Sequence, residues 1–341
     1  MLAEPGPGLP APLRLGLMGA QLRYLSAADV ETCLPPLARQ LELAERSLLA
    51  LAEADAEMPA KVGVHPRPGA LLHAMPAWLR SADVVGMKWV SAFPDNAARG
   101  LPSINGLIVL NDPDSGLPRT IMDAGRITAV RTAAVSGVAI RLWGQPELRT
   151  VAILGAGVQA RSHIPVVSVL RPGVELRIHD RHPDRADRLA TEARQSEGVS
   201  AAATAATARE AVEGADLVIT VGTLGSASQV IGPEWVGSGT RTLLVAVDFA
   251  THASADLART ARVFAVDDRG QFLAYRDSGS FARYPEPSVT LGEALSRRTP
   301  DAGGAGHVLV THLGIGAADV LFAEEVRLAG EQQGVGILLP R

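Results

Sequence analysis

The stretch Val151-Ala152-Ile153-Leu154-Gly155-Ala156-Gly157-Val158-Gln159-Ala160 decides the fold of this 341-residue chain. Four apolar residues predict a short buried strand, and the pattern Gly155-x-Gly157-x-x-Ala160 follows it and opens a helical stretch. The first glycine of such a pattern permits a tight turn, the second lets the backbone approach a pyrophosphate, and the alanine keeps helix and strand close. The helix N-terminus adds free N–H groups and a partial positive charge. The stretch therefore predicts a Rossmann-type unit that binds a dinucleotide.

Strands and helices alternate after this stretch. Further short apolar segments follow at residues 176–179, 217–220, 243–247 and 263–266, and helical patterns separate the earlier ones. Short apolar strands alternating with helices predict a parallel sheet that is covered on both faces and doubly wound by right-handed crossovers. The fold class is therefore α/β. Pro165 lies inside the helix that should follow the glycines, where a proline usually causes a kink.

The chain before this unit has a different pattern. We expect Ser26 to cap a helix and residues 37–51 to form an amphipathic helix. From residue 61 to residue 130, short apolar segments are separated by turn signals, which is typical of an antiparallel sheet with hairpins. Residues 132–142 and 317–328 are predicted to be helices, and the second is expected to return to this first sheet.

The bulk composition narrows the classes of function. The formal net charge of -4 and the isoelectric point near 6.1 provide no electrostatic argument for binding nucleic acid or an anionic membrane. Cys33 is the only cysteine and the eight histidines show no HExxH spacing, so we expect neither a disulfide nor a metal. No apolar run reaches the ~18 residues of a membrane span. The first twelve residues lack the pattern of a signal peptide, so we expect a cytoplasmic protein.

The choice of dinucleotide depends on Asp180, which follows the second strand of the unit. A carboxylate there accepts hydrogen bonds from the ribose hydroxyls of the adenosine and repels a 2′-phosphate, which favours NAD. Arg181 is adjacent and could instead attract that phosphate. We predict NAD.

Three charged residues are candidates for a substrate site. Lys88 lies in an otherwise apolar strand, where it either faces solvent or meets an anion. The guanidinium of Arg131 suits a carboxylate or a phosphate, although a structural ion pair is an equal alternative. Asp248 ends an apolar strand, at the edge where parallel sheets bind ligands, unless it caps a helix. An amino-acid oxidoreductase needs cations for a carboxylate and an acid–base group, and these residues provide both.

Several ordered motifs resemble the ornithine cyclodeaminase/mu-crystallin family over nearly the whole chain. They are His73-Ala74-Met75-Pro76-Ala77, Gly86-Met87-Lys88-Trp89-Val90, Asp95-Asn96, residues 106–113, Met122-Asp123-Ala124, Arg131-Thr132-Ala133-Ala134-Val135-Ser136, the GxGxQA pattern and Gly314-x-Gly316-x-x-Asp319-Val320. The resemblance implies an NAD-binding Rossmann domain over residues 131–315. It also implies an α+β substrate-binding and dimerisation domain formed by both chain ends, residues 1–130 with 316–341, in a homodimer.

The resemblance also assigns roles to residues. It implies that Lys88, Arg131 and Lys61 bind substrate carboxylates and that Lys88, Arg131 and Asp248 are catalytic. Many relatives have arginine where this chain has Lys61, which leaves the shape of the substrate open. The expected cofactor contacts are Gly155, Gly157, Val158, Gln159, Asp180, Arg181, Thr132, Ser103, Val221, Gly222 and Thr223.

Within the family, the chain is most similar to the branch of N-(2-amino-2-carboxyethyl)-L-glutamate dehydrogenases, on Lys88-Trp89, Asp95-Asn96, residues 109–113, Lys61, Val266-Asp267-Asp268 and the short tail past Gly334. Such enzymes oxidise a secondary amine with NAD and release 2,3-diaminopropionate and 2-oxoglutarate, for siderophores or peptide antibiotics. A partner synthase would make the substrate from O-phosphoserine and glutamate. The alternatives are an ornithine cyclodeaminase, an alanine dehydrogenase, a cyclic ketimine reductase, or a mu-crystallin-like binding protein without turnover.

Overall fold

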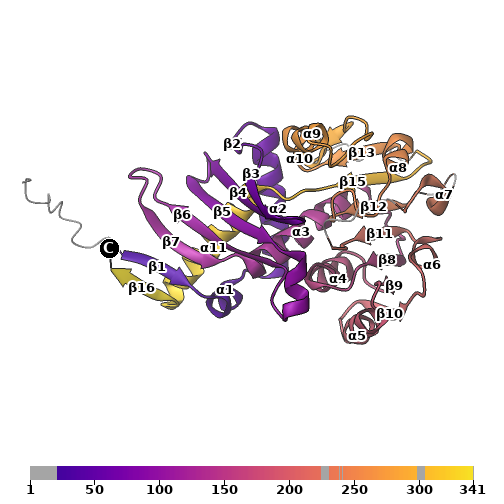
Figure 1. The fold of residues 1–341 in the computed structure, drawn as a ribbon, viewed down its shortest axis with the longest axis horizontal. Helices are drawn as coiled ribbons and strands as arrows, with labels where there is room; N and C mark the ends of the chain where they lie inside the picture. Colours follow the sequence, from indigo (N-terminus) through magenta and orange to yellow (C-terminus); the bar gives the residue numbers. More distant parts are fainter. Residues whose placement is uncertain (1–20, 224–229, 238, 240, 298–303, 341) are drawn as a thin grey trace, which may run out of the picture.

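The computed structural model describes residues 21–223, 230–237, 239, 241–297 and 304–340. Two eight-stranded sheets lie at opposite ends of the molecule (Figure 1). The first twelve residues, expected to be a tail and not a signal peptide, lie outside the described residues. Among the described helices, none is both long and apolar enough to cross a bilayer.

The first sheet has the order β16-β1-β7-β6-β5-β4-β2, and β3 also pairs with β4. Its strands are β1 (Gln21–Leu25), β2 (Ala56–Glu57), β3 (Val62–Arg67), β4 (Ala70–Leu79), β5 (Val84–Ala92), β6 (Ile104–Asn111), β7 (Pro118–Asp123) and β16 (Ile337–Pro340). The pairs from β4 to β7 are antiparallel, which confirms the predicted hairpins. A short 3-10 helix, η1 (Pro94–Arg99), links β5 to β6.

Helices from both ends of the chain cover one face of the first sheet. They are α1 (Ala27–Cys33), α2 (Leu37–Ala52) and α11 (Gly316–Gln333). Ser26 caps α1 as predicted, in a reciprocal pair with Asp29. Helix α11 packs against β4, β5 and β6, so the expected return of the last helix to the first sheet is confirmed.

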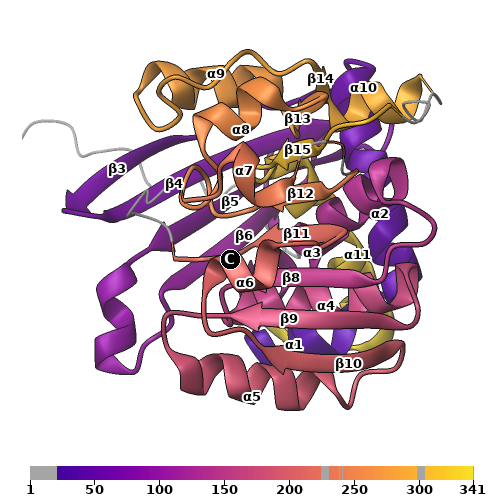
Figure 2. The ribbon, with the colours of Figure 1, turned by 90° about the vertical axis from the view of Figure 1, so that its right-hand side faces the viewer.

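The second sheet is parallel throughout and has the order β10-β9-β8-β11-β12-β15-β13-β14 (Figure 2). Its strands are β8 (Thr150–Leu154), β9 (Val174–His179), β10 (Val199–Thr204), β11 (Leu217–Thr220), β12 (Leu243–Ala246), β13 (Val263–Val266), β14 (Val289–Thr290) and β15 (Val308–Thr311). The order reverses between β8 and β11. Ligands of such sheets bind at this reversal, beyond the carboxyl ends of the strands.

The remaining helices connect these strands. They are α3 (Gly125–Trp143), α4 (Val158–Leu170), α5 (Pro183–Ala193), α6 (Ala208–Val212), α7 (Pro233–Val236), α8 (Ala255–Thr260), α9 (Arg269–Asp277) and α10 (Leu291–Ser296). Helix α3 contacts α2 and α11 of the first layer and α4 of the second, and its middle is almost wholly buried. One hydrophobic core therefore runs through both sheets. Helix α4 continues past Pro165 to Leu170, so the proline does not end it.

Candidate functional site

The glycine loop after β8 is open on the side where a phosphate would bind. Gly155 has φ +110°, and a Cβ there would lie 2.6 Å from the carbonyl oxygen of Val221, so only glycine fits. A Cβ on Gly157, by contrast, would meet no atom within 4 Å. Gly157 begins α4 without a side-chain cap, so the first N–H groups of the helix are available to an anion. This geometry fits the pyrophosphate of a dinucleotide.

The carboxylate of Asp180 is fixed beside this loop. One of its oxygens accepts a hydrogen bond from the Ala156 N–H at 2.8 Å, and the other accepts one from the His182 N–H at 2.8 Å. Each oxygen keeps a further lone pair for a ribose hydroxyl. Arg181 is exposed next to it, so the preference for NAD over NADP stays a prediction.

Lys88, Arg131 and Asp319 form a buried charge cluster from three elements, β5, α3 and α11. One oxygen of Asp319 lies 2.7 Å from Lys88 Nζ, and the other accepts a hydrogen bond from Arg131 Nε at 2.8 Å. The side chains of Lys88 and Asp319 are 1% and 0% exposed. The alternative of a solvent-facing Lys88 is therefore wrong. Gly314 leaves room for the cluster, because a Cβ there would lie 2.7 Å from Arg131 Nη1.

Burial and neighbouring charges decide the protonation of this cluster. Burial and the nearby Arg131 lower the pKa of Lys88, Asp319 opposes both, and the resulting pKa is about 7. Burial alone would raise the pKa of Asp319, but the two cations outweigh it and hold that pKa below its usual value. Asp319 is therefore ionised, and Lys88 is the member that titrates near neutrality.

Lys61 and Asp267 lie on the other side of the loop that follows β15. Lys61 donates to the carbonyl oxygen of Leu313, and Asp267 accepts from the N–H groups of Leu313 and Gly314 at 2.8 and 2.7 Å. Burial lowers the pKa of Lys61 to about 8 and raises that of Asp267 to about 6. Arg131 also lowers the pKa of Lys61, so the three predicted cations lie in one region.

Lys61 is also enclosed by aromatic rings. Its Nζ lies 5.8 Å from the ring centroid of Phe249 and 5.9 Å from that of Tyr275. These distances are within the range of a cation–π interaction. Phe249 follows Asp248 directly, so Lys61 is close to the end of β12.

Asp248 is fully enclosed at the end of β12. Among the described residues, its carboxylate accepts hydrogen bonds from Thr220 Oγ1 at 2.8 Å, from the Gly222 N–H at 2.9 Å and from His252 Nδ1 at 2.6 Å. It caps no helix, because Ser254 caps α8, so that alternative is wrong. The sequence patterns did not point to His252 or Asp319 as site residues, although Asp319 belongs to the motif Gly314-x-Gly316-x-x-Asp319-Val320.

A second histidine network lies behind the site. Ser136 Oγ is 2.8 Å from Nε2 of His163 and 2.8 Å from Nε2 of His312, and His163 Nδ1 is 2.7 Å from the carbonyl oxygen of Gln159. Burial lowers the pKa of His163 to about 4, so the ring is neutral. The network joins the first turn of α4 to the end of β15. His307 Nε2 lies 2.8 Å from the carbonyl oxygen of Leu257, which is a structural contact.

The other predicted cofactor residues fall into two groups. Val158 and Gln159 begin α4, Thr132 is buried on α3 next to Arg131, and Val221, Gly222 and Thr223 follow β11. Ser103 belongs to the other group, because it directly precedes β6 of the first sheet. The structure therefore places most of the set along one edge of the second sheet.

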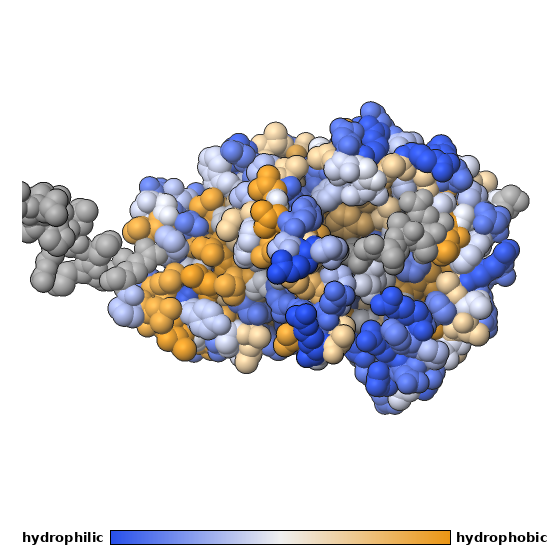
Figure 3. Space-filling view, viewed as in Figure 1, coloured by the Kyte–Doolittle hydropathy of each residue, from blue (hydrophilic) through white to orange (hydrophobic). Residues whose placement is uncertain are grey.

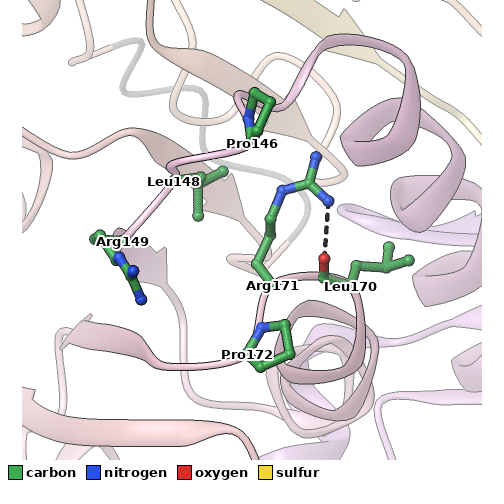
Figure 4. A pocket seen from close by; sticks show the side chains of 6 residues that line it. All are labelled: Pro146, Leu148, Arg149, Leu170, Arg171 and Pro172. Carbon is green, nitrogen blue, oxygen red and sulfur yellow. Dashed lines mark hydrogen bonds between the residues drawn. The ribbon is translucent and has the colours of Figure 1, made fainter.

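A cavity lies at the opposite edge of that sheet. It has a volume of about 390 Å³ and is lined by Pro146, Leu148, Arg149, Leu170, Arg171 and Pro172 (Figure 4). Arg149 precedes β8 and Arg171 follows α4, so the cavity lies where these elements begin and end, far from the glycine loop. Arg171 donates to backbone carbonyl oxygens, including that of Leu170. Within the described stretches, no group of three His, Cys, Asp or Glu side chains could hold a metal.

Comparisons with known proteins agree with this architecture. The model of the ornithine cyclodeaminase/mu-crystallin family matches residues 23–297. The nodulation efficiency protein NfeD of Rhizobium meliloti is 35% identical over 327 residues, 94% of this chain and 99% of that protein. The ketimine reductase mu-crystallin of Mus musculus is 31% identical, over 67% of this chain and 71% of that protein. The structure of Thermococcus litoralis Δ1-pyrroline-2-carboxylate reductase with NADH and L-proline has a TM-score of 0.81 and 26% identity, covering 92% of this chain and 99% of that one.

Proposed function

Because the chain belongs to the ornithine cyclodeaminase/mu-crystallin family, we propose that it is an NAD-dependent oxidoreductase that acts on the CH–NH bond of an amino acid. The observation that carries this proposal is the buried cluster of Lys88, Arg131 and Asp319. Two buried cations that share one carboxylate leave a positive charge for a ligand carboxylate. The named relatives include two reductases of imines, and one of them was solved with NADH and L-proline.

The glycine loop and Asp180 fit the cofactor of this reaction. The open space at Gly157 and the uncapped start of α4 accept the pyrophosphate, and Asp180 accepts from the ribose. When bound, NAD accepts a hydride at its nicotinamide ring. The residues beyond β11 and β12 then lie beside the reacting carbon, as expected at the carboxyl ends of the strands.

Each charged group has a task in this proposal. Lys88 and Arg131 hold the α-carboxylate, and Lys61 holds a second acidic group. Asp248 supplies a negative charge near the nitrogen, which becomes positive as the hydride leaves. Both signs of charge are needed close together, and Lys88, Arg131 and Asp248 provide both.

The finer proposal is the substrate N-(2-amino-2-carboxyethyl)-L-glutamate, which is oxidised and hydrolysed to L-2,3-diaminopropionate and 2-oxoglutarate as a siderophore or antibiotic precursor. Its support is the separation of the cations into two positions, Lys61 and the pair Lys88 with Arg131, which suits a substrate with several carboxylates. The synthase that uses O-phosphoserine and glutamate would be its pathway partner.

A cyclic ketimine reductase is the second candidate. Lys88, Arg131 and Asp319 together carry one net positive charge, which suits a substrate with one carboxylate. The relatives named above support the same class. An ornithine cyclodeaminase, an alanine dehydrogenase and a non-catalytic binding protein remain to be tested beside it.

The experiment compares these substrates directly. The purified protein is incubated with NAD and N-(2-amino-2-carboxyethyl)-L-glutamate, ornithine, alanine or proline, and separately with NADH and Δ1-pyrroline-2-carboxylate. Mass spectrometry follows the products, and calorimetry measures NAD binding. We expect 2-oxoglutarate and 2,3-diaminopropionate from the first substrate. Their absence contradicts the finer proposal. NAD binding without turnover of any substrate contradicts the proposed oxidoreductase and favours the binding protein.

We also propose that the chain forms a homodimer through the first sheet. The chain would be divided into a substrate-binding and dimerisation domain, residues 1–130 with 316–341, and an NAD-binding domain, residues 131–315. Trp89 and Leu107 are register partners on β5 and β6 and are 38% and 42% exposed, whereas Lys88 and Ile108 beside them are buried. Apolar side chains gather over this end of the molecule (Figure 3). A monomer mass in analytical ultracentrifugation would contradict the dimer.

A further inference from the structure

The pairing of Asp248 with His252 assigns a proton carrier to the site. We propose that His252 exchanges protons with the substrate and with water, and that Asp248 orients its ring and compensates its charge. This inference rests on the proposed function. It assigns to His252, and not to Asp248, the acid–base step of the reaction.

Asp248 is poorly placed to carry protons itself. Its side chain is buried, and its two oxygens accept from Thr220 Oγ1, the Gly222 N–H and His252 Nδ1. A carboxylate has about four lone-pair sites, so three of them are already used. Water reaches the dyad more readily through His252, whose side chain is 20% exposed.

The bond to Asp248 determines which nitrogen of His252 is the base. An ionised carboxylate can only accept, so the nitrogen that faces it must carry the hydrogen. That nitrogen is Nδ1, at 2.6 Å, a length typical of a charge-assisted bond. The lone pair of the neutral ring is therefore on Nε2. A carboxylate that orients an imidazole and stabilises its protonated form is the arrangement that hydrolases use for proton transfer.

The backbone is built to allow this pairing. Phe249 has φ +57°, in the left-handed region that a bulky residue rarely adopts, and the turn it makes brings His252 back to Asp248. The N–H of Ile231 donates to the carbonyl oxygen of His252 at 2.9 Å. A Cβ on Gly222 would lie 2.5 Å from Cε1 of the ring, so glycine is required there. Gly222 is also one of the predicted cofactor contacts, which places the ring beside the bound dinucleotide.

The proton steps balance with NAD as the oxidant. His252 Nε2 takes one proton from the secondary ammonium of the substrate and releases it to solvent. The C–H bond then breaks, its electron pair and hydrogen pass to NAD as a hydride, and a C=N⁺ bond forms. Water adds to that carbon and gives a proton to His252, which returns it to the nitrogen. The C–N bond breaks, the remaining hydroxyl proton passes to the released amine, and the products are a ketone and an ammonium.

The main test is His252→Asn. An asparagine amide can still donate to Asp248 from the position of Nδ1, but it has no base at the position of Nε2. If His252 carries protons, kcat falls by about 10²–10⁴-fold, while the dissociation constant of NAD and the melting temperature stay near those of the wild type. His65→Asn, on the exposed strand β3, is the matched control and should keep its rate. Imidazole in the buffer should partly restore the activity of His252→Ala.

A second measurement does not depend on turnover. Nitrogen-15 NMR of the labelled histidines, with and without NAD, should show His252 as the Nδ1–H tautomer, and Asp248→Asn should abolish that preference. An Nε2–H tautomer in the wild type, or near-full turnover by His252→Asn, overturns the inference and leaves the proposed function intact. A wild-type protein that turns over no amino acid overturns the proposed function, while the NMR result still reports on the dyad.

Discussion

Substituting Asp319 by asparagine removes the only negative charge in the contacts described for Lys88 and Arg131. The variant keeps the shape of the side chain, but the buried cations Lys88 and Arg131 then have no negative charge between them. In the wild-type protein the two oxygens lie 2.7 Å from Lys88 Nζ and 2.8 Å from Arg131 Nε. Removal of one partner from a buried ion pair costs about 3–5 kcal/mol of unfolding free energy. We expect a loss of this size in acid and a smaller loss in base.

The dependence on pH follows from Lys88. Its pKa is about 7 in the folded protein and 10.5 in an unfolded chain. Between these values the unfolded chain binds a proton at this group that the folded protein does not bind. This group therefore raises the free energy of unfolding as pH rises from 7 towards 10.5. Below pH 7 the wild type keeps the charged pair and the variant does not. Above pH 7 Lys88 of the wild type is already neutral and its ion pair with Asp319 is lost. The substitution therefore lowers the free energy of unfolding by a smaller amount there. The difference in stability should therefore shrink as pH rises through 7.

The measurement is urea denaturation at about pH 6 and about pH 8, followed by circular dichroism. Glu42→Gln is the control, because Glu42 pairs with Arg39 at the surface at 2.9 Å. Glu42→Gln should lower the free energy of unfolding by about 0–1 kcal/mol, and by the same amount at both pH values. A loss below about 1 kcal/mol for Asp319→Asn, or a loss that does not change with pH, would refute this account of the cluster.

The other predictions concern the cofactor. Gly157→Ala should fold with an unchanged melting temperature but bind NAD at least about tenfold more weakly in calorimetry, since the methyl group enters the space of the pyrophosphate. Gly155→Ala should instead lose about 1–3 kcal/mol of stability in thermal melts, because of its φ and the carbonyl oxygen of Val221. Asp180→Ala should lose the preference for NAD over NADP in kcat/KM; an unchanged ratio would show that Asp180 does not select the cofactor.

Local sequence patterns predicted the parts of the fold that depend on neighbours in the chain. The strand before Gly155, the hairpins of the first sheet and the capped start of α1 all have their determinants within a few residues. Strands β10, β15 and β16 are among those that the sequence patterns did not predict. β10 is alanine-rich and mostly exposed, and β15 follows a glycine-rich stretch. β16 is exposed and, in the described part of the chain, pairs with β1 alone. Such strands are defined by their partners and not by their own composition.

In the candidate site, too, local patterns predicted some features, and other features depend on tertiary contacts. Lys88 and Asp248 were identified by a charge in or after an apolar strand, but each kept a structural alternative that only tertiary contacts could remove. Asp319 lies 188 positions from Arg131 along the chain, so no spacing rule could connect them. A local signal was available for His252, which is four residues after Asp248, but i to i+4 spacing suggests a helix and this segment is a turn.

The charge cluster also determines what a substrate carboxylate meets. With Lys88 protonated, the two cations and Asp319 carry one net positive charge, and a carboxylate bound there would cancel it. Its negative charge would raise the pKa of Lys88, which burial holds near 7, so binding would draw a proton into the site at neutral pH. Asp319 keeps the cations ordered before the substrate arrives and limits their net charge to that of one carboxylate. Any further carboxylate must therefore be bound by a cation outside this cluster, and Lys61 lies nearby.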